Sequence, residues 1–151
     1  MNIFGSLKAS FLFTGILVCS TVIASDEVSR TKQLEDKILE VSSRENGNYL
    51  SIEPQEGDDM IEVWIGSDHN SPLHLMIGTY PLSEDPEEVF AQRNISLPDG
   101  WRITRWEKKV FAQFEGSVKN TSAIASWIDE IMIKLLNYPS NYEIVIGLGK
   151  L

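Results

Sequence analysis

The position of the single cysteine rules out an internal disulfide in the body of this chain. Cys19 lies within an apolar N-terminal run, and no thiol follows it. Small exported domains often depend on disulfides because their hydrophobic cores are small. This chain must instead be held by packing alone. We expect Leu34, Ile38, Trp127 and Ile131 to contribute to its core.

The N-terminal 24 residues have the features of a cleaved export signal. Lys8 gives a positively charged start, and an apolar run over residues 9–24 ends in a small-residue pattern. A transmembrane anchor is the alternative, but the run is shorter than the ~20 apolar residues that a span requires, and serine and threonine interrupt it. We predict a signal peptide over 1–24 and a single domain over 25–151.

The cysteine-free body indicates a compartment. An exported domain that lacks disulfides fits a bacterial periplasm best, so we expect a periplasmic or secreted protein. Lipid anchoring through Cys19 is disfavoured, because acylated cysteines usually follow a small residue and Val18 stands there instead. We expect no membrane span after cleavage.

The charge balance narrows the choice of partner. Acidic side chains outnumber basic ones by 22 to 13, and the formal net charge is −9. Loss of residues 1–24 removes one lysine and no acid, so the mature chain is more negative still. Phosphate backbones and anionic lipids repel such a chain, which disfavours nucleic acid and favours a basic protein partner. Alternatively, the surplus acid simply keeps an exported protein soluble.

Hydrophobic periodicity predicts the secondary structure. Period-two alternation and turn residues predict strands, while apolar residues at helical spacing and capping residues predict helices. Asp85 and Pro86 suit a helix start, and Asn120 or Thr121 caps the last helix. The expected strands are 49–53, 60–66, 73–80, 101–107, 110–115 and 142–148, and the expected helices are 28–45, 86–93 and about 121–136.

These elements follow the order α-β-β-β-α-β-β-α-β. Short polar turns between the first three strands predict an antiparallel meander. We therefore expect an α+β fold with a single antiparallel β-sheet and flanking helices.

The first eight elements resemble the type III secretion chaperone superfamily in their order. Asp99-Gly-Trp101, which follows a short acidic helix, is also similar to the related Tyr-C-terminal chaperone-like domains. The resemblance implies a small acidic protein that holds an unfolded partner segment on its surface. It also implies dimerisation, so a homodimer stays open here. Family members work in the cytoplasm, whereas this chain has an export signal, and its strand at 142–148 lies outside the family pattern.

No residue pattern points to catalysis, a cofactor or a metal. His69 and His74 are five residues apart across a turn into a strand, which is not a metal-binding pair on a helix. The acidic turn at 56–59 lacks the spaced ligands of a calcium loop. Paired carboxylates for hydrolysis remain an alternative, but nothing singles out one pair.

The tryptophans are candidate contact residues. Trp127 belongs to the apolar stripe of the last helix, whereas Trp64 points away from its strand's Ile61, Val63 and Ile65 face. Trp101 and Trp106 are five apart on one strand, so we expect them on opposite faces. Exposed aromatic side chains are favoured interface anchors. Our predicted partner-binding residues are Trp64, Trp106, Glu62, Asp58 and Asp59.

The sequence thus favours a non-enzymatic, exported protein-binding module. An inhibitor, an immunity protein that neutralises a toxin, or a periplasmic chaperone would suit its size, acidity and compartment. The alternative is a small periplasmic hydrolase with an unrecognised carboxylate site.

Overall fold

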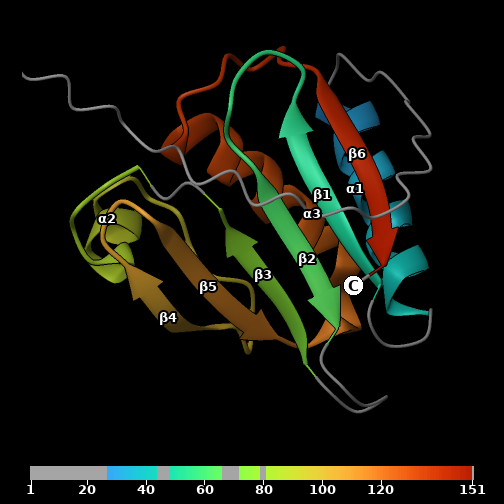
Figure 1. The fold of residues 1–151 in the computed structure, drawn as a ribbon, viewed down its shortest axis with the longest axis horizontal. Coiled ribbons are helices and arrows are strands. Elements are labelled where there is room, and N and C mark those ends of the chain that lie inside the picture. Colours follow the sequence, from blue (N-terminus) through green and yellow to red (C-terminus); the bar gives the residue numbers. More distant parts are fainter. Residues whose placement is uncertain (1–26, 44–47, 66–71, 79–80, 151) are drawn as a thin grey trace, which may run out of the picture.

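In the described part of the chain, six antiparallel strands form one sheet in the order β4-β5-β3-β2-β1-β6 (Figure 1). The computed structural model describes residues 27–43, 48–65, 72–78 and 81–150. The strands are β1 (Asn48–Pro54), β2 (Ile61–Ile65), β3 (Leu73–Ile77), β4 (Arg102–Glu107), β5 (Phe111–Gly116) and β6 (Ile144–Lys150).

Three α-helices accompany these strands in the described residues: α1 (Glu27–Ser42), α2 (Pro86–Gln92) and α3 (Thr121–Glu130). A short 3-10 turn, η1 (Val118–Asn120), precedes α3, and a π-helical turn, η2 (Ile131–Leu135), continues it. The predicted α+β class and the predicted order of elements are confirmed. The predicted signal at 1–24, with Cys19, lies outside the described residues. Within the described ranges, no helix has the length and apolar character that crossing a bilayer requires.

Both long helices lie on one face of the sheet, behind β1, β2 and β6 in Figure 1. They contact each other, and α1 also contacts β1, β2 and β6. Alternate strand residues face these helices and are fully buried, namely Leu50, Ile52, Ile61, Val63, Leu73, Leu75, Ile77 and Phe114. The predicted stripe of the last helix is also buried, with Ile124, Trp127, Ile128, Ile131 and Leu135 in the core. Burial of these apolar side chains drives formation of the two layers.

The helix starts follow the capping chemistry of the sequence. The Asp85 side chain accepts a hydrogen bond from the backbone N–H of Glu87 at 2.9 Å, and Pro86 occupies the first helical position of α2. Asn120 accepts one from the backbone N–H of Ala123 at 3.1 Å and caps α3. Each cap satisfies an N–H that has no partner within its helix.

Several boundaries differ from the prediction. Helix α1 ends at Ser42 rather than at 45, and residues 44–47 lie outside the described residues. Strand β1 runs through Pro54, which the sequence placed in a turn, and β6 begins two residues later than predicted, at Ile144. The chain stays paired beyond Pro54 because the Gln55 N–H donates to the Glu143 carbonyl at 2.8 Å.

The prediction that Trp101 and Trp106 lie on opposite faces is wrong. The register of β4 against β5 shifts between Ile103 and Arg105, which is a β-bulge that inserts one extra residue. Trp101 therefore lies over Gly116 and is 7% exposed, and Trp106 pairs with core-facing Ala112 and packs against the core. Both tryptophans lie on the helix-covered face.

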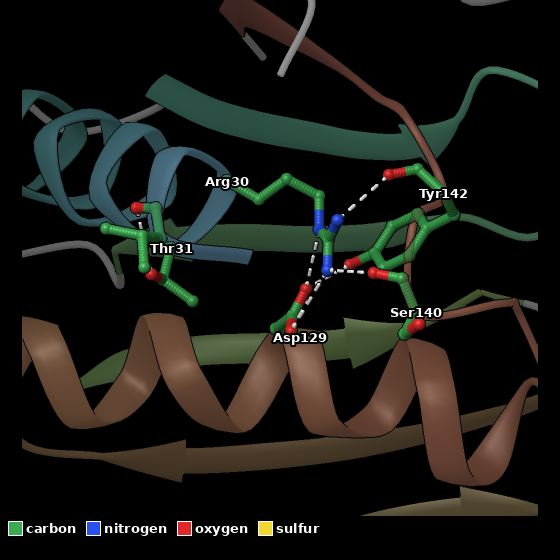
Figure 2. Close-up of polar contacts among 6 residues, drawn as sticks. Arg30, Thr31, Asp129, Ser140 and Tyr142 are labelled. Atoms are coloured by element: carbon green, nitrogen blue, oxygen red, sulfur yellow. Dashed lines mark hydrogen bonds and ion pairs between the residues drawn. The ribbon is translucent and has the colours of Figure 1, made fainter. Parts of the chain in front are cut away.

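A buried ionic network joins α1 to α3 and to the segment that enters β6 (Figure 2). The Arg30 side chain is fully buried, and its Nε donates to Asp129 Oδ1 at 2.9 Å. Its other nitrogens donate to the carbonyls of Ser140 at 2.9 Å and Tyr142 at 3.2 Å. The Tyr142 hydroxyl donates to Asp129 Oδ1 at 2.8 Å, and the Arg30 guanidinium lies 4.3 Å from the centre of the Tyr142 ring.

This network compensates for the burial of two charges. Burial lowers the pKa of Arg30, but the hydrogen bond and charge of Asp129 more than offset that effect, so the pKa rises above its usual value. Burial and the negative charge of Asp129 raise the pKa of Tyr142, which keeps its hydroxyl protonated as a donor. Loss of Arg30 would leave the Asp129 charge in the interior without its cation.

We predict that Arg30→Met destabilises the fold by about 3–5 kcal/mol, because Asp129 loses its cation in the interior. Urea unfolding followed by circular dichroism measures this loss. Lys32→Met on the same helix is the matched control, since Lys32 pairs with Glu35 and Asp36 at the solvent-exposed surface and should matter little. The combined Arg30→Met/Asp129→Leu variant should lose less than the sum of its single changes. Equal stability of Arg30→Met and wild type would contradict the role of the network.

Candidate functional site

The second face of the sheet, here called the open face, lies opposite α1 and α3 (Figure 1). No described helix packs on it. Strand register arranges its side chains in two rows that cross the sheet. The first row contains Tyr49, Trp64, His74, Glu115 and Arg102, and the second contains Ser51, Glu62, Met76, Gln113 and Arg105.

The first row is aromatic at one end and ionic at the other. Trp64 and His74 stack with ring centres 5.5 Å apart and planes 16° apart. Tyr49 lies over Gly149 of β6, where a Cβ atom would come within 2.4 Å of the tyrosine ring. Gly149 therefore allows the tyrosine to lie flat on the sheet. The row presents rigid aromatic surface on strands, which suits contact with a protein.

The ionic end of the row surrounds Glu115. Arg102 Nε donates to Glu115 Oε1 at 2.8 Å, and His74 Nδ1 lies 3.9 Å from Glu115 Oε2. The distance to His74 is too long for a hydrogen bond. His74 Nδ1 is buried and has no hydrogen-bond partner among the described residues.

The second row places the carboxylate of Glu62 beside an apolar side chain. Glu62 lies between Ser51 on β1 and Met76 on β3 and is partly buried. Its carboxylate has no hydrogen bond or ion pair with any described residue. Burial raises the pKa of Glu62, because desolvation disfavours its charged form. A cation brought by a partner would relieve this penalty.

The predicted contact residues fall in three places. Trp64 and Glu62 lie together on the open face, and the predicted orientation of Trp64, away from the Ile61 and Val63 face, is confirmed. Asp58 and Asp59 lie at the end of the sheet, where Asp59 Oδ2 accepts a hydrogen bond from the Tyr138 hydroxyl at 2.7 Å. Trp106 lies on the helix-covered face at the edge of the core.

Sequence reasoning did not single out Tyr49 or Met76 for this site. The alternation of β3 did place His74 and Met76 opposite Leu73, Leu75 and Ile77, and this is confirmed. Only the register shows that Tyr49, Trp64 and His74 form one row. The last strand has glycine at the alternate positions 147 and 149. This pattern could have indicated that a side chain of a neighbouring strand lies over it.

The described residues offer little for metal chemistry. No three histidine, cysteine, aspartate or glutamate side chains gather within 27–43, 48–65, 72–78 and 81–150. His69, the other histidine of the chain, lies outside these ranges. Comparison of the chain with protein-family models, with curated proteins and with solved structures found no match.

We predict that Glu62→Gln stabilises the protein at neutral pH by less than about 1 kcal/mol, because this side chain is partly exposed and partly screened. The raised pKa of Glu62 means that the unfolded chain loses its proton first as pH rises, so stability falls with rising pH. The advantage of the variant should vanish below the ordinary carboxyl pKa. Thermal unfolding of the variant and of wild type, at neutral pH and below the ordinary carboxyl pKa, measures this difference in stability.

The matched control is Glu53→Gln, which removes an exposed carboxylate from the neighbouring strand β1. A gain that is the same at acid and neutral pH, or that Glu53→Gln reproduces, would show that lowered net charge and not burial of Glu62 causes the effect.

Proposed function

We propose that this chain is an exported, non-enzymatic module that binds a basic protein partner on its open face. The observation that supports this most is the row of Tyr49, Trp64 and His74 on a face that no described helix covers. Beside this row lies Glu62, whose carboxylate has no partner among the described residues. Rigid aromatic side chains on strands provide contact area with little loss of conformational entropy.

Electrostatics would select and orient the partner. The chain carries a net charge of −9, which attracts a basic surface at long range. At contact, Glu62 would pair with a cation of the partner, and Met76 beside it would adapt to apolar groups. Charge then governs the association rate, and the buried aromatic anchors govern the dissociation rate.

The order of elements and the N-terminus support particular forms of this role. The chaperone-like order favours a module that holds a segment of another protein, and the expected signal at 1–24 supports a location in the periplasm or outside the cell. A periplasmic chaperone and an inhibitor or immunity protein both meet these conditions. They differ in the partner, which is an unfolded segment for the former and a folded toxin or enzyme for the latter.

We predict that Trp64→Ala weakens partner binding by about tenfold or more, since truncation of a central aromatic anchor typically removes more than 1 kcal/mol. The measurement is purification of the tagged chain from the envelope of the producing cells, followed by association kinetics with the recovered partner. Leu39→Ala is the control, because Leu39 is an exposed apolar residue on α1. Its binding should match that of wild type.

Two further readouts belong to this experiment. The association rate should fall as ionic strength rises, because salt screens long-range attraction. The intact mass of the recovered chain should correspond to a start at Ser25. The proposal fails if Trp64→Ala binds like wild type while remaining folded, or if salt leaves the association rate unchanged. Turnover of a glycan or peptide that depends on carboxylates at 56–59 or 84–88 would favour the hydrolase instead.

A further inference from the structure

A pocket of about 360 Å³ opens where β1 ends and β6 begins, away from the two rows of the open face. The residues around the end of β1 and those between η2 and β6 form its walls, and we call it the tyrosine pocket. Its principal lining residues are Pro54, Glu56, Tyr138, Pro139, Tyr142 and Glu143. This volume lies at the lower end of the range for ligand sites, which suits one side chain of a partner.

Two contacts hold the Tyr138 wall of the pocket in place. Its hydroxyl donates to Asp59 Oδ2 at 2.7 Å, and its ring lies over Gly57, where a Cβ would come within 2.2 Å of the tyrosine oxygen. Gly57 also has a φ of 138°, which side-chain-bearing residues rarely adopt. Burial and the hydrogen bond to Asp59 raise the pKa of Tyr138 to about 12, so its hydroxyl stays a donor. The pocket is therefore formed before any ligand arrives.

The pocket combines aromatic rings with unpaired carboxylates. The ring centres of Tyr138 and Tyr142 are 5.8 Å apart. Glu56 and Glu143 line the same space, no basic side chain lines it, and neither carboxylate has a partner among the described residues. Aromatic faces and carboxylates together attract cations.

The protein already binds one guanidinium with this chemistry. On the interior side, Arg30 packs 4.3 Å from the ring centre of Tyr142, pairs with Asp129 and donates to the Ser140 carbonyl (Figure 2). The tyrosine pocket has the same kinds of groups on the solvent side, namely a tyrosine ring and carboxylates, and it is built from the same 138–143 segment. The interior site is occupied by the chain itself, whereas the outer one is open.

We propose that the tyrosine pocket binds the guanidinium of an arginine side chain presented by the protein partner. A planar guanidinium can stack on Tyr138 while it donates to Glu56 or Glu143, which an ammonium cannot do equally well. The identity of the partner rests on the proposed function, but the chemistry of the pocket does not. The acidic turn that includes Asp58 and Asp59 then contributes by fixing Tyr138 and by adding negative potential near the site.

The test is a titration of the mature protein with N-acetyl-arginine amide, followed by NMR signals of the Tyr138 ring and the Gly57 amide. The lysine and citrulline analogues are the matched ligands, since citrulline replaces the guanidinium with a neutral urea of the same shape. We expect saturable shifts with arginine, weaker binding of lysine and none of citrulline. The double variant Glu56→Gln/Glu143→Gln should weaken arginine binding at least tenfold.

Glu53→Gln is the control for general charge, and Trp64→Ala is the control for the open face; both should bind arginine like wild type. The proposal is overturned if arginine gives no saturable shift, if citrulline binds equally well, or if Glu53→Gln weakens binding as much as the double variant does. Intact arginine binding by Trp64→Ala, together with undiminished partner binding, would refute the proposed function alone. If Glu56→Gln/Glu143→Gln loses arginine binding but captures the partner like wild type, the pocket does not bind an arginine of the partner, while the proposed function stands.

Discussion

The buried pair of Arg30 and Asp129 fixes the arrangement on which the rest of the structure depends. It joins α1 to α3 in the interior, and its hydrogen bonds to the 140–142 segment also fix the entry to β6. Both helices are thereby held on the same face of the sheet (Figure 1). Their apolar stripes cover the side on which β1, β2, β3, β5 and β6 carry buried residues, and the alternate side chains must then face the other way. The open face is a direct consequence of this one-sided packing.

Much of the fold could be predicted because its signals are local. Alternation in β2 and β3 identified the core side of each strand, and the caps at Asp85 and Asn120 identified two helix starts. The orientation of Trp64 followed from the same alternation. These features depend on residues within one turn or one strand of each other, so the sequence alone carries them.

The parts that sequence reasoning missed depend on long-range contacts. The bulge in β4 places Trp106 on the helix-covered face, and no residue pattern in this strand predicts the bulge. Arg30 lies 99 positions before Asp129 in the chain, so a buried ion pair between them cannot be inferred from the spacing within α1. The link from Asp59 to Tyr138 likewise spans 79 positions. Of the predicted contact residues, only Trp64 and Glu62 were placed together by the register.

The two proposed surfaces share one physical feature, which is a carboxylate that lies near aromatic groups and has no cationic partner among the described residues. On the open face Glu62 stands beside Trp64, and in the tyrosine pocket Glu56 and Glu143 stand beside Tyr138. The carboxylates give each site a negative potential that attracts cations, and the surplus of acidic residues in the chain strengthens it. A basic partner would contact both sites at once, and two points of contact would fix its orientation.

Site-specific photo-crosslinking can show directly whether the open face is the binding surface. A photoreactive amino acid would replace Met76 on the open face or, separately, Leu39 on the outer surface of α1, in the cells that make the protein. We expect that position 76 captures one basic protein, that position 39 does not, and that Trp64→Ala abolishes the product from position 76. Capture from position 39 with none from position 76 would contradict the assignment of the open face as the binding surface.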